Sequence, residues 1–146
     1  MAVAELFLIA RLAGRRIAVP AAKVEAVVEL EGITPAPGAA AHVSGLAALR
    51  SRVLTVIDGR AALELGRAGE AAARDAIVVP CDGHTYALIV EEVEDVVEAD
   101  RPPAALAAPV GAGWDRVAIG TVEVENELFL LIDPFLLIAG PAAQAA

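Results

Sequence analysis

The strongest constraint on the fold of this chain is a six-residue segment that occurs twice. The segment VEAVVE at residues 24–29 returns as VEDVVE at residues 93–98, with one mismatch and an offset of 93 − 24 = 69 residues. The same offset aligns Gly14 with Gly83 without a gap. A match that extends beyond the segment itself predicts two halves with similar folds.

A second pair of segments supports this duplication. Gly45 aligns with Gly120 at an offset of 120 − 45 = 75, and the apolar residues 53–58 align with residues 128–133 at the same offset. The six extra residues correspond to one loop of different length. Valine, glutamate and alanine are common in this chain, so the hexapeptide alone could be a chance match. Two collinear pairs favour an internal repeat.

The pattern within each half predicts strands. Apolar runs of about four to eight residues, rich in β-branched side chains, alternate with turn signals such as Ala13-Gly14 and Asp82-Gly83. Asp58 and Asp133 are expected to cap short helical turns after the last strand of each half. We therefore predict an all-β protein, in which about five strands per half close into an antiparallel barrel, with a few short helices.

The length of 146 residues is suited to one domain made of two such barrels. We expect this domain to span residues 1–140, with subdomains at about 1–66 and 73–140 whose terminal strands can be exchanged. The polar stretch 67–74 is the expected crossover, and residues 102–113 form the longest expected loop. Residues 141–146 are expected to be a disordered tail.

Charge and cysteine content restrict the class of partner. The net charge of −9 disfavours nucleic acid and anionic membrane surfaces as ligands, because their phosphates would be repelled. The most apolar stretch, residues 128–138, is too short for a membrane span and contains Asp133-Pro134, so no membrane insertion is expected. The single cysteine, Cys81, excludes an internal disulfide and fits a reducing compartment. A secretory signal is also not expected.

Catalytic patterns are scarce in this sequence. His42 and His84 lie in different halves, and neither has a cysteine or carboxylate at a metal-ligand spacing. The sequence has no nucleophile elbow and no glycine-rich phosphate loop. We therefore expect no catalytic residues, no metal and no cofactor.

The repeated hexapeptide is more informative about binding. On a strand, Val27 lies on the same face as Glu25 and Glu29, and Val96 occupies the equivalent position in the second copy. These valines form either a small apolar docking patch bordered by acids, or core contacts created by a twist or bulge. Arg50, which precedes the strand at 53–57, is either a solvated side chain or an interface anchor.

Five segments of the first half resemble one known family. They are IAVP at 17–20, ITPAPG at 33–38, HVSGL at 42–46, LR at 49–50 and VLTVIDGR at 53–60. This series is similar to the CheW family of bacterial chemotaxis coupling proteins, and the similarity runs from about residue 5 to residue 138. The resemblance implies two five-stranded SH3-like barrels, in agreement with the repeat.

The resemblance also implies a function. Members of this family are non-enzymatic adaptors that join the cytoplasmic tip of chemoreceptors to the regulatory domain of the histidine kinase CheA. A cytoplasmic protein at receptor arrays on the inner membrane face is therefore expected. The family's interface positions fall here on Val24, Gly45, Arg50, Val93 and Val96; together with Val27 they form the expected partner-binding set.

Other functions remain open at this stage. The chain departs from the family pattern at Ala26, Ala48, Ser51 and Thr55. A diverged CheW-like paralogue in a pathway unrelated to motility is one alternative. A small-ligand-binding or enzymatic barrel is another, because a fold does not determine a function.

Overall fold

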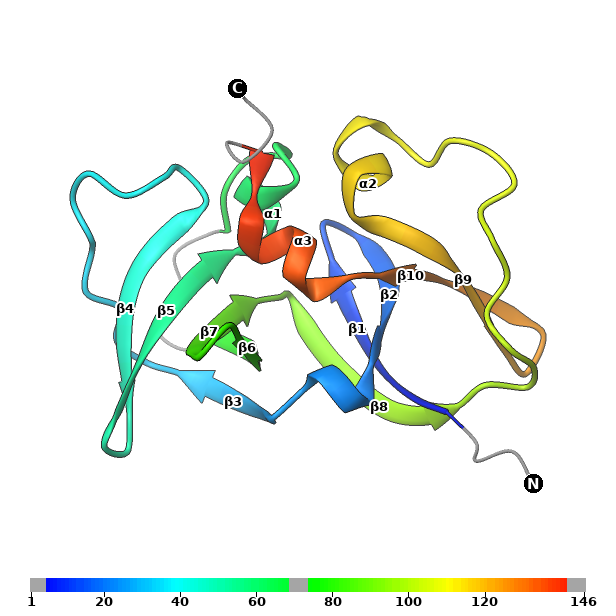
Figure 1. Ribbon diagram of the computed structural model, residues 1–146, viewed down its shortest axis with the longest axis horizontal. Helices are drawn as coiled ribbons and strands as arrows, with labels where there is room; N and C mark the ends of the chain where they lie inside the picture. The colour runs from blue at the N-terminus through cyan, green and yellow to red at the C-terminus, as the bar shows by residue number, and fades with distance from the viewer. Residues whose placement is uncertain (1–4, 69–73, 142–146) are drawn as a thin grey trace.

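The computed structural model describes residues 5–68 and 74–141, which form two five-stranded sheets side by side (Figure 1). Sheet 1 has the order β3-β6-β7-β5-β4, and sheet 2 has the order β8-β1-β2-β10-β9. The strands of sheet 1 are β3 (Ala26–Leu30), β4 (Val43–Leu49), β5 (Arg52–Asp58), β6 (Arg74–Cys81) and β7 (His84–Ile89). Those of sheet 2 are β1 (Leu6–Leu12), β2 (Arg15–Pro20), β8 (Glu92–Glu98), β9 (Ala118–Val124) and β10 (Glu127–Ile132).

The helices of the described part of the chain are short. They are the 3₁₀ turn η1 (Ala21–Lys23) and the α-helices α1 (Gly59–Ala62), α2 (Ala112–Val117) and α3 (Pro134–Ala139). The predicted fold class, mostly strands with a few short helices, is confirmed. None of these helices has the length and apolar character needed to cross a membrane.

The structure follows the sequence repeat element by element. Strands β4 and β9, strands β5 and β10, and the starts of α1 and α3 are related by the offset of 75. The predicted hairpin turns are also present: Ala13-Gly14 has φ values of 51° and 79°, and Asp82-Gly83 has 50° and 81°. Positive φ at both central residues is the geometry that joins two strands tightly. The two halves therefore share their turns as well as their strands.

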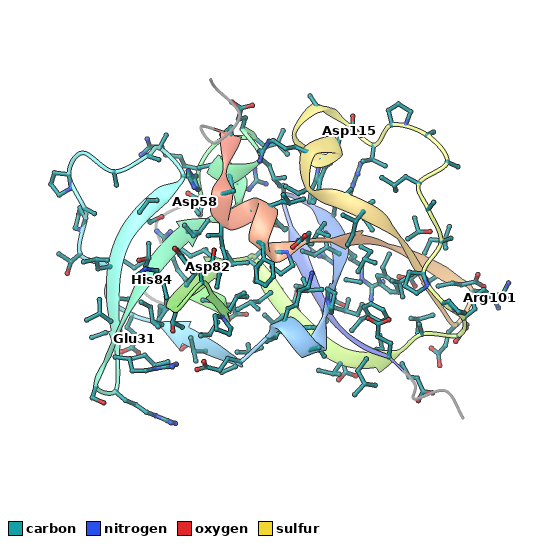
Figure 2. The ribbon with its side chains drawn as sticks, in the orientation of Figure 1. Glu31, Asp58, Asp82, His84, Arg101 and Asp115 are labelled. Carbon is teal, nitrogen blue, oxygen red and sulfur yellow. The ribbon has the colours of Figure 1, made fainter. Side chains whose placement is uncertain are left out.

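Both predicted helix caps are confirmed. The Asp58 carboxylate, labelled in Figure 2, accepts hydrogen bonds from the backbone N–H groups of Arg60 at 3.0 Å and Ala61 at 3.2 Å. The Asp133 carboxylate accepts one from Phe135 N–H at 2.9 Å, with Pro134 at the first helical position. These bonds satisfy N–H groups that have no partner within the helix.

Each sheet takes strands from both halves of the chain. Hairpin β1–β2 of the first half lies in sheet 2 with β8, β9 and β10, and hairpin β6–β7 of the second half lies in sheet 1 with β3, β4 and β5. We propose that each subdomain is one sheet, with the first hairpins of the two halves exchanged. Parts of the predicted crossover and tail, residues 69–73 and 142–146, lie outside the described residues.

The largest hydrophobic core lies between the two sheets, and we call it the inter-sheet core. Its buried strand residues from sheet 2 are Leu8, Ala10, Leu12, Ile17, Val19, Leu130 and Ile132; those from sheet 1 are Ile57, Ile77, Val79 and Leu88. Two smaller cores fill the opposite faces of the sheets. Strand β1 shows why both faces are apolar, because Leu8 and Ala10 point to the inter-sheet core while Phe7 and Ile9 point to the core of sheet 2.

The region 102–113 is only partly the loop that we expected. Helix α2 begins at Ala112, and Ala104 forms two backbone hydrogen bonds with Thr121 of β9. Trp114 on α2 is buried in the inter-sheet core. This helix was not predicted because only its packing, and not a capping signal, identifies it.

Candidate partner-binding surface

The two copies of the hexapeptide form most of the two edge strands β3 and β8. These strands and η1 run along the lower side of Figure 1. In β3, Ala26 and Val28 pack against the core of sheet 1, whereas Val27 points outward and is 45% exposed. Period-two alternation on an edge strand leaves the outward side chain without a neighbouring strand to cover it.

Val96 occupies the equivalent position on β8. It is 49% exposed and lies opposite Leu8 of β1, just as Val27 lies opposite Ile77 of β6. The register between β1 and β8 shifts between Asp95 and Val93, yet Val96 stays exposed. The alternative that a twist or bulge buries both valines is therefore wrong.

Val24 and Val93 have a different environment. Both are partly buried and pack against the inter-sheet core. The exposed Val27 and Val96 are paired with Ile77 and Leu8, which belong to that core. Val24 follows η1, where its N–H donates to Ala21 O at 3.1 Å, and Val93 N–H donates to the Asp75 carboxylate at 3.4 Å. Val24 and Val93 therefore lie beneath the surface that Val27 and Val96 expose, and contribute little exposed area to it.

Gly45 is buried, and its role in the structure is steric. A Cβ atom there would lie 2.1 Å from the carbonyl oxygen of Thr34, and its φ of 149° is one that glycine tolerates best. Thr34 and Leu46 exchange two backbone hydrogen bonds at this point. Any effect of Gly45 on partner binding would therefore act through the backbone of β4.

Arg50 lies at the tip of the β4–β5 hairpin, away from the exposed Val96 of β8. It is exposed, and it lines a surface groove of about 350 Å³ between this hairpin and β3. The other lining residues are Glu25, Ala26, Val28, Leu49, Ser51 and Arg52. The structure thus brings Arg50 beside the first copy of the hexapeptide but not beside the second.

Ion pairs hold some of the acids near these strands. Glu25 pairs with Arg52, whose hydrogen bond lowers the pKa of the Glu25 carboxyl. Glu94 pairs with Arg16 at 2.8 Å, and this bond raises the pKa of the Arg16 guanidinium. Exposed pairs of this kind contribute little stability, so their main effect is on the charge presented to a partner.

One pair of exposed apolar residues was not among the predicted contact residues. Val53 on β5 is 66% exposed, and Leu128 at the equivalent position on β10 is 67% exposed. Leu46 and Ile119 on the neighbouring strands are also exposed, at 41% and 47%. Strand alternation could have found Val53, because its neighbour Leu54 is fully buried and points to the other face.

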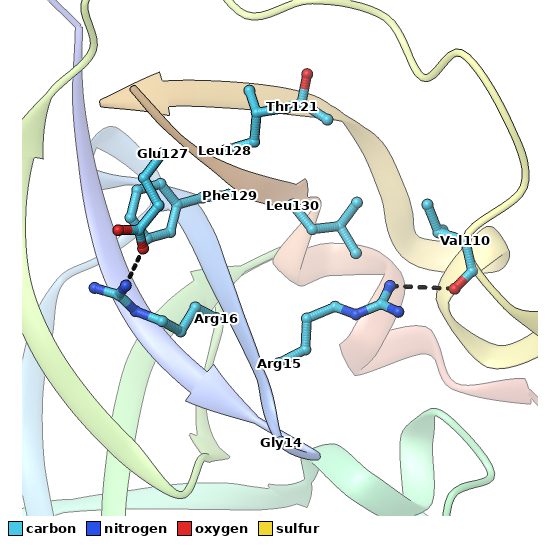
Figure 3. A pocket seen from close by; sticks show the side chains of 9 residues that line it. All are labelled: Gly14, Arg15, Arg16, Val110, Thr121, Glu127, Leu128, Phe129 and Leu130. Carbon is cyan, nitrogen blue, oxygen red and sulfur yellow. Dashed lines mark hydrogen bonds and ion pairs between the residues drawn. The ribbon is translucent and has the colours of Figure 1, made fainter. Parts of the chain in front are cut away.

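Leu128 borders a second groove, of about 540 Å³, that Figure 3 shows from close by. Arg15 donates a hydrogen bond to Val110 O at 3.1 Å across this groove and lies over the ring of Trp114. Arg16 is paired with Glu127 on the other side of the groove. Both arginines are thus engaged within the fold, and the open part of the groove is mainly apolar.

The described residues contain no arrangement that indicates catalysis. No group of three or more His, Cys, Asp or Glu side chains within residues 5–68 and 74–141 could hold a metal ion. His42 is buried and bonded to Ile138 O at 2.8 Å. Partial burial raises the pKa of the Cys81 thiol, which makes its reactive thiolate less abundant. Exposed apolar side chains within a polar border are a feature that protein-contact surfaces share.

Comparisons with known proteins agree with the fold described above. A family model described as a CheW-like domain matches residues 6–141. Among solved structures, the crystal structure of the scaffolding protein TtCheW from Thermoanaerobacter tengcongensis is similar, with a TM-score of 0.77, 22% sequence identity, and 89% of each chain covered. At 22% sequence identity, this similarity shows a shared fold and nothing further. A search of curated proteins found no match.

Proposed function

The chain belongs to the CheW-like domain family, and from this premise we propose that it is a non-enzymatic adaptor that couples chemoreceptors to a CheA-type histidine kinase. Its partners would be the regulatory domain of that kinase and the cytoplasmic tip of a receptor. An adaptor of this kind acts in the cytoplasm, at receptor arrays on the inner face of the membrane.

The observation that carries this proposal is the exposure of Val27 and Val96. Both lie at equivalent positions on edge strands, and each is paired with a residue of the inter-sheet core, Ile77 or Leu8. Acids flank each of them in sequence, which keeps the edges soluble and discourages strand pairing between copies. A half-exposed valine within a polar border suits a protein contact that forms and dissociates.

The proposed binding set divides into two roles. Val27, Val96 and Arg50 are the residues that a partner would contact, because their side chains are exposed. Val24, Val93 and Gly45 are positioning residues, because they are partly or fully buried beneath the surface.

Binding measurements on purified proteins test this function. A CheA-type regulatory domain and a chemoreceptor cytoplasmic hairpin would each be titrated with the wild-type chain and with Val96→Asp and Arg50→Glu. We expect the wild type to bind at least one of them, and each substitution to weaken binding by about 1 to 2 kcal/mol, or roughly tenfold.

Leu65→Asp is the matched control. Leu65 is 43% exposed, similar to Val96, and it follows α1 in the chain. Helix α1 lies in the upper part of Figure 1, whereas β3 and β8 run along the lower side. The control should bind both partners as the wild type does. If neither partner binds the wild-type chain, the coupling function is wrong; if both substitutions bind normally, only the site assignment is wrong.

A further inference from the structure

The groove between β3 and the β4–β5 hairpin carries a local positive charge in an acidic protein. The groove beside Leu128 has the same formal charge, but both of its arginines, Arg15 and Arg16, are bonded within the fold. The charged residues of the groove between β3 and the β4–β5 hairpin are Glu25, Arg50 and Arg52, so its local formal charge is +1 in a chain of net charge −9. Ala26, Val28 and Leu49 supply an apolar lining. The groove therefore combines a small apolar surface with a local excess of positive charge.

Arg50 accounts for this excess. The neighbouring Arg52 is paired with Glu25 through both of its terminal nitrogens, so those two charges cancel. Within residues 5–68 and 74–141, Arg50 has neither an ion pair nor a side-chain hydrogen bond, and its side chain is exposed. A guanidinium has five N–H donors in a planar array that matches a carboxylate.

The geometry of the turn does not explain an arginine at this position. Arg50 has a φ of 58°, in the left-handed region where glycine and asparagine are favoured and a longer side chain is strained. Glycine would fit this turn with less strain. Glu125 has a φ of 51° at the equivalent position of the other hairpin, so this φ belongs to the turn and leaves the choice of arginine to be explained by its side chain.

The equivalent hairpin of sheet 2 has the same fold and the opposite charge. Glu125 stands where Arg50 stands in the first hairpin, and Glu127 stands in place of Arg52. There Glu127 and Glu94 both pair with Arg16, and the backbone N–H of Glu125 donates to the Asp100 carboxylate at 2.9 Å. Only the first hairpin presents an arginine that the described residues leave available.

We propose that the groove around Arg50 recognises an aspartate or glutamate side chain of a partner protein, with an adjacent apolar side chain of that partner resting on Ala26, Val28 and Leu49. The carboxylate would accept two hydrogen bonds from the Arg50 guanidinium. This inference rests on the proposed function, since it specifies the chemistry of a partner at the same surface.

A pair of peptides tests the recognition without any signalling partner. Capped Ala-Leu-Glu-Leu-Ala and its glutamine counterpart Ala-Leu-Gln-Leu-Ala would each be titrated into the isotope-labelled full chain, with backbone amide shifts as the readout. We expect the glutamate peptide to shift residues 25–28 and 49–52, and to bind at least about tenfold more tightly than the glutamine peptide. Its affinity should fall as salt concentration rises.

Two substitutions separate recognition from folding. Arg50→Gly removes the guanidinium and also relieves the strained φ, so the melting temperature should not fall while the glutamate preference is lost. Ala26→Glu keeps Arg50 but places a carboxylate inside the groove, and it should also abolish the preference. Glu125→Gln, at the equivalent position of the other hairpin, is the matched control and should bind the glutamate peptide as the wild type does.

The outcomes distinguish this inference from the coupling function. Equal binding of the two peptides, or an unchanged preference in Arg50→Gly, would overturn the carboxylate site even if kinase and receptor bind normally. Concentration-dependent shifts of residues 49–52 without peptide would assign the groove to a second copy of the chain, which also overturns it. A retained glutamate preference without kinase or receptor binding would support the site and count against the coupling partners.

Discussion

At the scale of single residues, Glu91 makes contacts that its exposed position would not suggest. Its carboxylate accepts hydrogen bonds from Gly14 N–H at 3.0 Å and from Arg60 Nε at 3.1 Å. Gly14 belongs to the β1–β2 turn, Arg60 belongs to α1, and Glu91 itself lies between β7 and β8. One side chain thus joins three segments that are far apart in the sequence and belong to both sheets.

These contacts predict a pH dependence of stability. Partial burial raises the pKa of Glu91, but the bonds from Gly14 and Arg60 outweigh it, so the pKa lies below its ordinary value of 4.5. A carboxyl with a lowered pKa in the folded state stabilises the fold above its unfolded pKa, and that contribution is lost as pH falls through the folded value. Glu91→Gln should therefore reduce the free energy of unfolding by about 1 kcal/mol at neutral pH, and this difference should vanish in acid below the folded pKa.

Urea denaturation at a series of pH values checks this expectation. Glu92→Gln is the control, because Glu92 is the exposed neighbour and forms no ion pair or side-chain hydrogen bond within the described residues. A constant difference between Glu91→Gln and the wild type at every pH would contradict the role of the carboxylate charge.

At the scale of elements, the two halves use the same device to close their sheets. The segment around Thr34 crosses β4 at Gly45, and the segment around Ala104 crosses β9 at Gly120. A Cβ at Gly120 would lie 2.5 Å from the carbonyl oxygen of Ala104, much as a Cβ at Gly45 would meet Thr34. Both glycines are needed because the crossing backbone occupies the space of a side chain.

Alanine substitutions measure the cost of this close approach. Gly45→Ala should lower the free energy of unfolding by roughly 2 to 4 kcal/mol, because it combines a backbone clash with an unfavourable φ. Gly14→Ala is the matched control: Gly14 also has a positive φ, of 79°, but nothing lies within 4 Å of the added Cβ. Thermal denaturation should rank Gly45→Ala well below Gly14→Ala, and equal losses would show that the clash is relieved without cost.

At the scale of the whole molecule, the inter-sheet core joins the two sheets, and we expect them to unfold as one cooperative unit. It contains buried residues from both sheets and Trp114, the only tryptophan of the chain. Exchange of the first hairpins strengthens this coupling, because each half of the chain contributes to both sheets. Neither sheet has a complete set of strands from one half alone.

Unfolding measured by two spectroscopic signals tests whether the two sheets unfold together. Leu88 is on β7 of sheet 1 and is 1% exposed, so Leu88→Ala should cost about 3 kcal/mol. The loss should appear equally in Trp114 fluorescence and in far-ultraviolet circular dichroism, because both report one transition. Val53→Ala, at a 66% exposed position of the same sheet, should change stability by at most about 0.5 kcal/mol. Two separate transitions would show that the sheets unfold independently.

The local features of this protein are determined by its sequence. The repeat, the strands, the hairpin turns at Ala13-Gly14 and Asp82-Gly83, and the caps at Asp58 and Asp133 all depend on contacts between neighbouring residues. The alternation of side chains along a strand also predicted that Val27 lies on the opposite face from its neighbours Ala26 and Val28. For the same reason the two halves could be recognised as copies without knowledge of how they pack.

Only the tertiary structure decided how these pieces combine. Which hairpin enters which sheet, and whether Val96 is covered, depend on packing between residues far apart in the sequence, and such packing leaves no local pattern. Helix α2 exists because Trp114 is buried between the sheets, and Gly45 is a glycine because the backbone of Thr34 crosses it. Arg50 shows the same limit most clearly: its sequence neighbours do not reveal that Arg52 is neutralised by Glu25, while Arg50 has no ion pair among the described residues.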